Sequence, residues 1–299
     1  MSTAYNAIAA NKRRSIILII VFTLIVLALG WTFGQLSESG SAGLVLAGMI
    51  AIGMALGGYY GGDRLALSMA RAHGPIQKTD NPYLWNMVEN LCIASGTPMP
   101  KLYLLPEEGI NAFATGRDPE HASIAVTAGA LQKLENEELE GVLAHELSHV
   151  RNYDVRFMTL VAVLVGIIAI LSDFGTRFMW FGGNRRSSSR EGGANGIFLI
   201  IGLVLLILAP IIGQLLKFAL SRKREFLADA SGALLTRYPE GLARALEKIQ
   251  ADGQRPLAHT SGATAHMYIS NPFGGKGMAK IFSTHPPVEE RVKALRAMG

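Results

Sequence analysis

Long apolar stretches alternate with polar segments along this chain of 299 residues. A helix needs about 20 mostly apolar residues to cross the hydrocarbon core of a membrane, and three of the stretches reach that length. The third stretch, FMTLVAVLVGIIAILS, is shorter and would also suit a buried core helix, but another clear apolar stretch follows it closely. We therefore interpret all four as membrane spans, at residues 15–36, 40–61, 157–174 and 197–217.

The polar segments predict a domain with both helices and strands. Asn81 and Pro82 form a helix start, and NAFAT and SIAVT flank the turn-forming segment GRDPEH as the arms of a hairpin would. Asn136 can cap another helix, and Glu137 and Glu138 suit the positive end of its dipole. The expected elements are a helix at 81–95, strands at 101–105, 111–115 and 123–127, helices at 136–152, 221–235 and 239–250, a mobile polar loop at 254–280 and an amphipathic helix at 285–298.

Charge is low overall but strongly segregated. Charged residues make up 17% of the chain, against about 25% in typical soluble domains. None of the 28 Lys and Arg or 23 Asp and Glu lies within 15–37, 39–62, 157–172 or 192–216. This pattern argues against a soluble monomer and a disordered tail, and the single cysteine, Cys92, argues against a disulfide scaffold.

The distribution of basic residues predicts the orientation of the spans. Lys12, Arg13 and Arg14 precede the first span, which places the N-terminus in the cytoplasm and favours an uncleaved signal anchor. The arginines between the third and fourth spans oppose this orientation, but the total bias favours it. The expected order is a cytoplasmic N-terminus at 1–14, cytoplasmic segments at 63–156 and 218–299, and one outside loop at 175–196.

The segment His-Glu-Leu-Ser-His at 145–149 carries the most specific chemistry. Positions i and i+4 of a helix share a face, so His145 and His149 can present imidazole nitrogens to one metal ion. Glu146 lies one position further round, where it can act as a general base towards water without being a ligand. The alternative, three polar side chains on a solvated helix face, is less consistent with the predicted helix around them.

A catalytic zinc site needs a third protein ligand and an open position. Glu225 is the candidate, because the chain returns to the same predicted side of the membrane and to similar depth after the fourth span. Asp229 follows on the same helix face and can accept an imidazole N–H. A juxtamembrane ion pair between Glu225 and Arg222 or Arg224 remains open on spacing alone.

Three motifs in chain order, HELSH, SRKREFLADASGA and FSTHPPVEERVKAL, resemble those of the HtpX-type membrane zinc metallopeptidases, which are relatives of the CAAX prenyl endopeptidase. The similarity covers nearly the whole chain and includes KRR before the first span and NAFATG at 111–116. It implies one Zn²⁺ per chain, bound by His145, His149 and Glu225, with Asp229 completing the ExxxD motif. The expected fold is a mainly α membrane protein with about four transmembrane helices and a cytoplasmic α+β zincin-like metallopeptidase domain.

The resemblance also implies an activity. It predicts a quality-control endopeptidase of the bacterial inner membrane, active in the stress response, that hydrolyses misfolded or damaged membrane proteins from the cytoplasmic side. The expected partners are unfolded or membrane protein substrates and the lipid bilayer, with no nucleic acid.

Further residues are assigned roles in this scheme. His285 is a candidate donor to the oxyanion, although a histidine at a helix start is an equally good interpretation. Asn111, Ala112 and Phe113 form the start of a strand that could pair with an extended substrate by β-addition, or be an ordinary strand. Four remaining histidines lack partners at ligand spacing and are expected in surface or loop positions: His73, His121, His259 and His266.

Other functions stay open at this point. A zinc transporter is disfavoured because no predicted span carries a carboxylate or histidine in its interior. A catalytically silent membrane adaptor that only binds unfolded chains would need neither metal nor cleavage. Within the enzyme class, the alternative is a narrow processing protease of the prenyl-peptide type.

Overall fold

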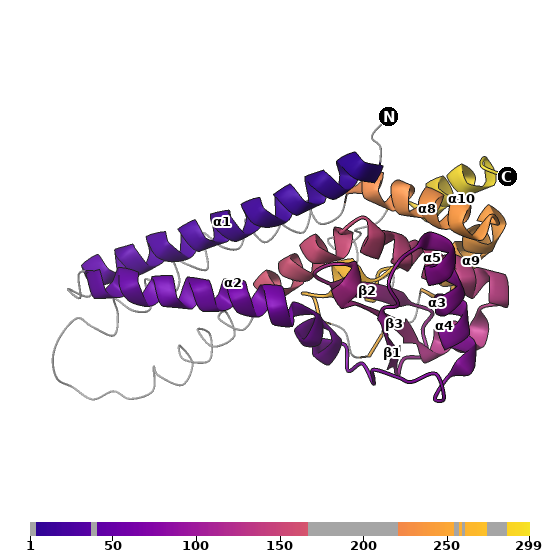
Figure 1. Ribbon diagram of the computed structural model, residues 1–299, viewed down its shortest axis with the longest axis horizontal. Coiled ribbons are helices and arrows are strands. Elements are labelled where there is room, and N and C mark those ends of the chain that lie inside the picture. The colour runs from indigo at the N-terminus through magenta and orange to yellow at the C-terminus, as the bar shows by residue number, and fades with distance from the viewer. Residues whose placement is uncertain (1–3, 37–40, 167–220, 254–256, 259–260, 274–285) are drawn as a thin grey trace.

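Two long helices project from one end of the molecule, side by side (Figure 1). They are α1, Ala4–Leu36, and α2, Ser41–Met69. The computed structural model describes residues 4–36, 41–166, 221–253, 257–258, 261–273 and 286–299. The first predicted span, 15–36, lies within α1, which begins 11 residues before it, and α2 covers the second predicted span, 40–61, from Ser41 on.

Large apolar side chains of α1 and α2 point away from the protein. Ile17, Leu24 and Trp31 of α1 and Met49 and Ile52 of α2 are each about half exposed or more. Within the part of the chain that the structure describes, one helix, α2, has both the length and the apolar composition to cross a membrane. The four-span arrangement therefore stays a prediction, because the fourth predicted span lies outside the described residues.

The helix that the structure describes over residues 154–166 packs against α1 and α2. Its apolar residues Phe157, Leu160 and Val161 form a buried cluster with Leu18 and Phe22 of α1. Two glycines of α2 make a second contact possible. A Cβ atom at Gly62 would lie 2.9 Å from Thr159, and one at Gly58 would lie 3.2 Å from Val163. The described part of the third predicted span is thus enclosed by protein where it joins the domain.

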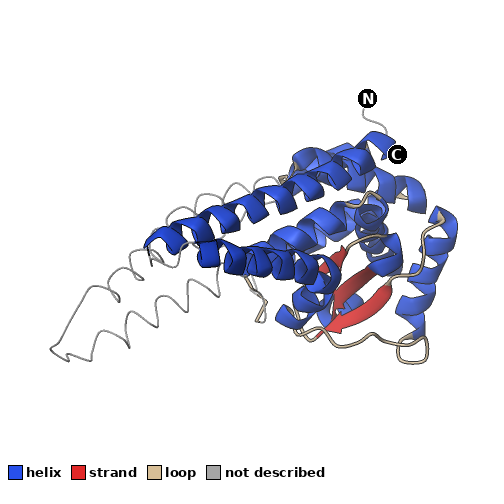
Figure 2. Ribbon diagram, turned by 60° about the vertical axis from the view of Figure 1, so that its left-hand side comes forward, coloured by secondary structure: helices blue, strands red, loops and turns tan. Residues whose placement is uncertain are grey.

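A three-stranded sheet forms the centre of the remaining domain (Figure 2). Its order is β1-β3-β2, with β1 parallel to β3 and β2 antiparallel to β3. The predicted hairpin is confirmed, with Phe113 opposite Ala125 in the register. The strands are β1, Lys101–Leu105; β2, Ala112–Gly116; and β3, Ala122–Thr127, preceded by the 3₁₀ turn η1, Pro119–His121.

Helices surround the sheet and share one apolar core with it. The predicted helices are confirmed with small shifts at their ends, and one short helix directly after β3 was not predicted. The core joins leucines from separate elements, among them Leu84, Leu143, Leu246 and Leu295. The helices are α3, Pro82–Ser95; α4, Ala128–Lys133; α5, Asn136–Arg151; α8, Arg222–Thr236; α9, Pro239–Asp252; and α10, Val288–Arg296.

The prediction of a mobile loop at 254–280 is wrong for residues 261–273, which the structure describes. Residues 261–273 include the 3₁₀ turn η2, Ala265–Met267, and pack against the domain. The N–H of Ile269 donates to the carbonyl oxygen of Ala112 at 3.0 Å, and the ring of Tyr268 meets that of Phe113 edge to face. Polar composition predicted mobility, but these apolar residues bury the segment along the outer edge of β2.

Candidate metal centre

Helix α5 carries the histidine motif through the interior of the protein. Its N-cap is Glu135 rather than the predicted Asn136, because the N–H of Glu135 donates to the carboxylate of Glu138 at 2.8 Å. The side chain of Asn136 instead accepts a hydrogen bond from Tyr83. Every residue from 141 to 150 is buried, so the polar side chains of the motif must find partners inside the protein.

Helix α8 approaches α5 very closely at the motif. A Cβ atom at Gly232 would lie 3.0 Å from the backbone nitrogen of His145, so any side chain there would press against the backbone of α5. The close approach brings the first turn of α8, which carries Glu225, to the two histidines. Residues separated by 80 positions therefore meet because two helices pack backbone to backbone.

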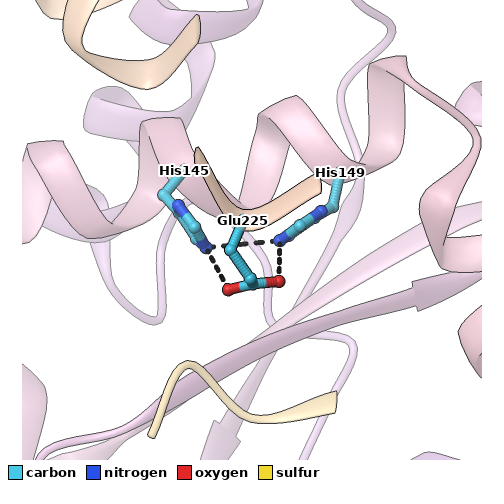
Figure 3. A group of neighbouring side chains, drawn as sticks. All are labelled: His145, His149 and Glu225. Carbon is cyan, nitrogen blue, oxygen red and sulfur yellow. Dashed lines mark hydrogen bonds and ion pairs between the residues drawn. The ribbon is translucent and has the colours of Figure 1, made fainter. Parts of the chain in front are cut away.

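Three side chains converge at this contact (Figure 3). The Nε2 atoms of His145 and His149 lie 3.2 Å apart. The carboxylate oxygens of Glu225 lie 3.8 Å from His145 Nε2 and 3.6 Å from His149 Nε2. One ligand atom from each residue falls within 4.8 Å of the others, and all three residues are buried.

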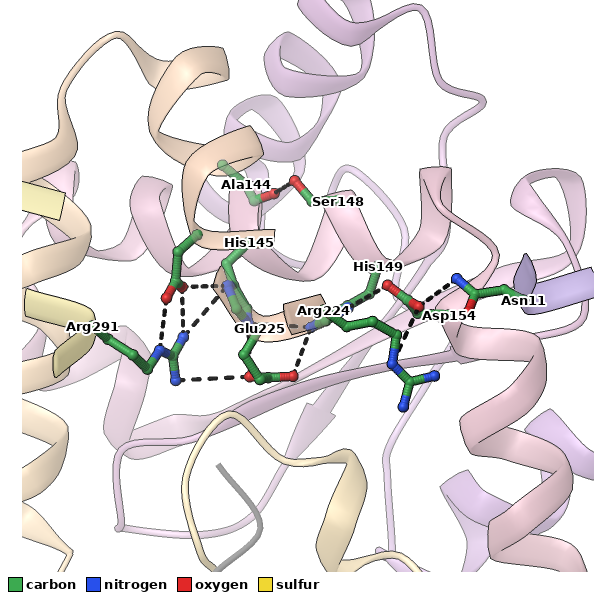
Figure 4. A network of polar contacts seen from close by, with 10 residues as sticks. Asn11, Ala144, His145, Ser148, His149, Asp154, Arg224, Glu225 and Arg291 are labelled. Carbon is green, nitrogen blue, oxygen red and sulfur yellow. Dashed lines mark hydrogen bonds and ion pairs between the residues drawn. The ribbon is translucent and has the colours of Figure 1, made fainter. Parts of the chain in front are cut away.

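A carboxylate contacts Nδ1 of each histidine, and the contact between Asp154 and His149 can be followed in Figure 4. Asp229 lies 2.9 Å from His145 Nδ1, and Asp154 lies 3.1 Å from His149 Nδ1. This geometry suits the tautomer that a metal-binding histidine needs, in which Nδ1–H donates to the carboxylate and the Nε2 lone pair is left for the ion. Asp229 fulfils its predicted contact with an imidazole.

Arg291 of α10 closes one side of this network. Its Nε and Nη2 donate to the two oxygens of Asp229 at 2.8 and 2.6 Å, a bidentate pair. Its Nη1 lies 3.9 Å from Glu225. Although burial acts in the opposite direction, Arg291 lowers the pKa of Asp229 to about 2, so that this carboxylate stays charged at neutral pH. Arg224 Nε lies 3.7 Å from Asp154 Oδ1, and Arg224 also interacts electrostatically with Glu225.

The electrostatics of the two histidines differ. Burial lowers the pKa of His145, whereas for His149 the hydrogen bond to Asp154 and the charge of Glu225 outweigh burial and raise the pKa. The two Nε2 atoms lie 3.2 Å apart, so they cannot both carry a proton without strong repulsion.

Glu146 lies beside the cluster with one carboxylate oxygen uncommitted. The carboxylate of Glu146 accepts a hydrogen bond from the backbone of Ala114 in β2. Among the described residues, its Oε2 is buried without any hydrogen-bond partner. Burial raises the pKa of Glu146 to about 8, which suits a group that takes up and releases a proton near neutral pH.

Comparison with known proteins identifies the family. The sequence profile of Peptidase family M48 matches residues 78–299. The chain belongs to peptidase family M48. It is therefore a metalloprotease, and the converging His145, His149 and Glu225 form a cluster able to bind the metal that M48 enzymes use.

Two kinds of relative extend this result over the first helices. "Protease HtpX homolog" from Dictyoglomus thermophilum is 45% identical over 297 residues, covering 99% of this chain and 95% of that protein. The protein of the same name from Lactobacillus acidophilus is 42% identical, covering 98% of this chain and 99% of that protein. The crystal structure of S. mikatae Ste24p shares the fold, with a TM-score of 0.51 and 17% identity over 97% of this chain and 67% of that chain. This M48 protein is thus of the HtpX type along its whole length.

The M48 domain does not leave the predicted substrate strand free. The β2 strand is at the edge of the sheet, but Ala112 and Phe113 already pair with residues 268 and 269. The side chain of Asn111 donates to the carbonyl oxygen of Ser270 at 3.1 Å. These three residues bind residues 268–270 of the same chain, which satisfies backbone groups at the sheet edge that would otherwise lack partners.

The predictions for the other five histidines have three outcomes. His285 and His259 lie outside the described residues, so the predicted oxyanion role of His285 stays a prediction. His121 and His73 are exposed, as predicted. His266 is not a surface residue: it is buried, and its Nε2 donates to the carbonyl oxygen of Met158 at 3.0 Å.

Two residues of the M48 site were missed by the sequence interpretation. Asp154 follows the motif directly, five positions after His149, and its charge beside an apolar stretch was a usable signal. Arg291 lies in the last predicted helix, and the sequence interpretation gave it no role. In the folded chain it contacts Asp229, which lies 62 positions earlier in the sequence.

Proposed function

We propose that this chain is a zinc endopeptidase of the bacterial inner membrane that hydrolyses misfolded or damaged membrane proteins. The observation that carries the proposal is the convergence of His145 Nε2, His149 Nε2 and the Glu225 carboxylate beside an uncommitted oxygen of Glu146.

The donor set fits zinc. Zinc in proteins prefers four-coordinate sites with nitrogen and oxygen ligands, and His₂Glu with one open position is a catalytic arrangement. An ion about 2.0–2.1 Å from its ligands holds tetrahedral ligand atoms roughly 3.3 Å apart. The three separations here are 3.2, 3.6 and 3.8 Å, so closure needs only small side-chain shifts.

The chain's own residues supply positioning and proton transfer. Zinc, when bound, acts as a Lewis acid and makes water a nucleophile at neutral pH. Asp154 and Asp229 hold the imidazoles in the tautomer that exposes Nε2. Glu146 Oε2 accepts the proton of the attacking water and returns it to the leaving amine. Its hydrogen bond from Ala114 fixes the carboxylate while leaving that oxygen available.

The membrane location is supported by the first two helices. Their large apolar residues, including Val45 and Met49, are exposed over long lengths, and soluble monomers rarely present such continuous apolar surface to water. Lys12, Arg13 and Arg14 favour a cytoplasmic start, which places the metal centre on the cytoplasmic side in a multi-pass arrangement.

The substrate class follows from this location. A peptidase domain joined to membrane helices is suited to chains that emerge unfolded from the bilayer. The runner-up is a narrow processing protease of the prenyl-peptide type.

The proposal is tested with full-length protein purified in detergent and reloaded with zinc. An unfolded membrane protein, casein and a prenylated CAAX peptide are offered separately to the wild type and to Glu146→Gln. The proposal predicts cleavage of the unfolded proteins by the wild type, loss on chelation and no cleavage by Glu146→Gln. Exclusive cleavage of the CAAX peptide would favour the processing protease, and zinc flux without proteolysis would contradict both.

A further inference from the structure

The N-terminal part of α1 is linked to the metal centre through Asp154 (Figure 4). The side-chain Nδ2 of Asn11 donates to Asp154 Oδ1 at 2.6 Å and to the carbonyl oxygen of Asn152 at 2.9 Å. The second oxygen of Asp154 contacts Nδ1 of His149. A polar connection of two hydrogen bonds therefore runs from α1 to a candidate zinc ligand 138 positions later in the chain.

This contact is buried and built on both sides. Asn11 and Asp154 are each 1% exposed, so water does not replace either partner. Ser15, one turn along α1, is also buried, and its hydroxyl donates to the carbonyl oxygen of Asn11. Asn11 thus sits on an inward face of α1, three residues before the exposed Arg14.

Asn11 uses both of its N–H groups at the point where the chain turns after α5. Asn152 and Tyr153 form the turn between α5 and the helix that begins at 154, and Tyr153 has a positive φ of 59°. Bonding to the Asn152 carbonyl and the Asp154 carboxylate together fixes the turn and the orientation of that carboxylate. Arg224 adds a weaker contact, with Nε 3.7 Å from Asp154 Oδ1.

We propose that Asn11 is a positioning residue of the metal centre, which acts through Asp154 to hold His149 in its ligand orientation. The inference rests on metal binding by His145, His149 and Glu225. Asn11 precedes the first apolar stretch and lies outside residues 78–299, which the M48 profile matches. The peptidase domain of this chain is accordingly incomplete without α1.

The physical reason is that zinc binding weakens when the hydrogen bond at Nδ1 of a metal-binding histidine is lost. A metal-binding histidine depends on the group that receives its other N–H, and loss of such a group typically weakens metal binding about 10- to 100-fold. Without Asn11, Asp154 Oδ1 would keep only the longer contact to Arg224 among the contacts described above. The carboxylate would then be free to rotate away from His149.

The test measures zinc affinity by chelator competition on full-length protein in detergent, with no protease assay. The variants are Asn11→Leu, which keeps the volume but donates nothing, and Asn11→Ser, which is polar but too short to bridge. Ser15→Ala is the matched control, because it removes a buried hydroxyl one turn away without touching Asp154. We expect both Asn11 variants to bind zinc about tenfold more weakly than the wild type and Ser15→Ala to stay within about twofold.

A double-mutant cycle separates positioning from general packing. In an Asp154→Ala background, Asn11→Leu should cause little further loss of zinc affinity, because its route to His149 is already gone. The visible spectrum of the Co²⁺-loaded protein should lose tetrahedral intensity in Asn11→Leu and keep it in Ser15→Ala.

Three results would overturn the inference. Wild-type affinity in both Asn11 variants would show that Asp154 needs no support from α1. An equal loss with and without Asp154 would show that Asn11 acts through packing alone. A wild type that binds no zinc would remove the proposed function as well, and this outcome is distinguishable because it appears before any variant is compared.

Discussion

Replacing Arg291 with leucine should destabilise the domain severely. Arg291 is 1% exposed and makes the bidentate contact to Asp229, which is itself buried. The variant leaves that carboxylate without its cation, next to the buried Glu225. Removing one partner of a buried ion pair costs about 3–5 kcal/mol, because the other charge stays desolvated.

The expected effect on melting follows from the size of the domain. For 150–250 residues, 1 kcal/mol moves the melting midpoint by about 2–4 °C, so Arg291→Leu should unfold roughly 10 °C earlier than the wild type. The assay is thermal unfolding followed by circular dichroism on the metal-free protein, which excludes any contribution from zinc. Arg291→Lys keeps the charge but loses the planar pair of donors, so it should fall between the two.

Arg296→Leu is the matched control for this prediction. Arg296 lies on the same helix, α10, and also contacts two carboxylates, Glu240 and Glu247, but all three side chains are exposed. Exposed ion pairs contribute little, so this variant should melt with the wild type. If Arg291→Leu melts with Arg296→Leu, Asp229 does not depend on Arg291 and the network argument fails.

Three further predictions concern separate parts of the molecule. Glu146→Gln should keep wild-type zinc content and lower cleavage by about 10²–10⁴ or more, and residual cleavage near the wild-type rate would remove Glu146 from proton transfer. Gly232→Val should lower the melting midpoint and weaken zinc binding, because its side chain would enter the 3.0 Å space beside His145; an unchanged midpoint would contradict the close approach of α8 to α5. Burial raises the pKa of the Cys92 thiol to about 11, so at pH 8 it is protonated and should react with a disulfide reagent much more slowly in the native than in the unfolded protein, and equal rates would contradict its burial.

Local signals predicted most of the secondary structure. Asn81 and Pro82 do start α3, with the Asn81 side chain accepting from the N–H of Leu84 at 3.0 Å. The strands and their hairpin were readable because β-branched and apolar residues flank a polar turn. Segment 261–273 was misjudged, since its burial depends on Phe113 and Ala112, which lie far away in sequence.

The metal cluster was predictable where helix geometry or motif resemblance pointed to it. The i, i+4 spacing placed His145 and His149 together, and the predicted return of the chain across the membrane made Glu225 a candidate that the resemblance supported. The supporting residues were not predictable in the same way. Asn11 and Arg291 reach the centre through tertiary packing over 143 and 62 positions, and nothing local in their segments distinguishes them from other polar residues.

The most direct test of the account is the zinc content of purified full-length protein, measured for the wild type and for Glu225→Ala after equal exposure to zinc and gel filtration. The account predicts one zinc ion per chain in the wild type and almost none in Glu225→Ala, with the variant still folded by circular dichroism. Equal zinc content in the two proteins, or none in the wild type, would contradict the assignment of His145, His149 and Glu225 as the metal centre.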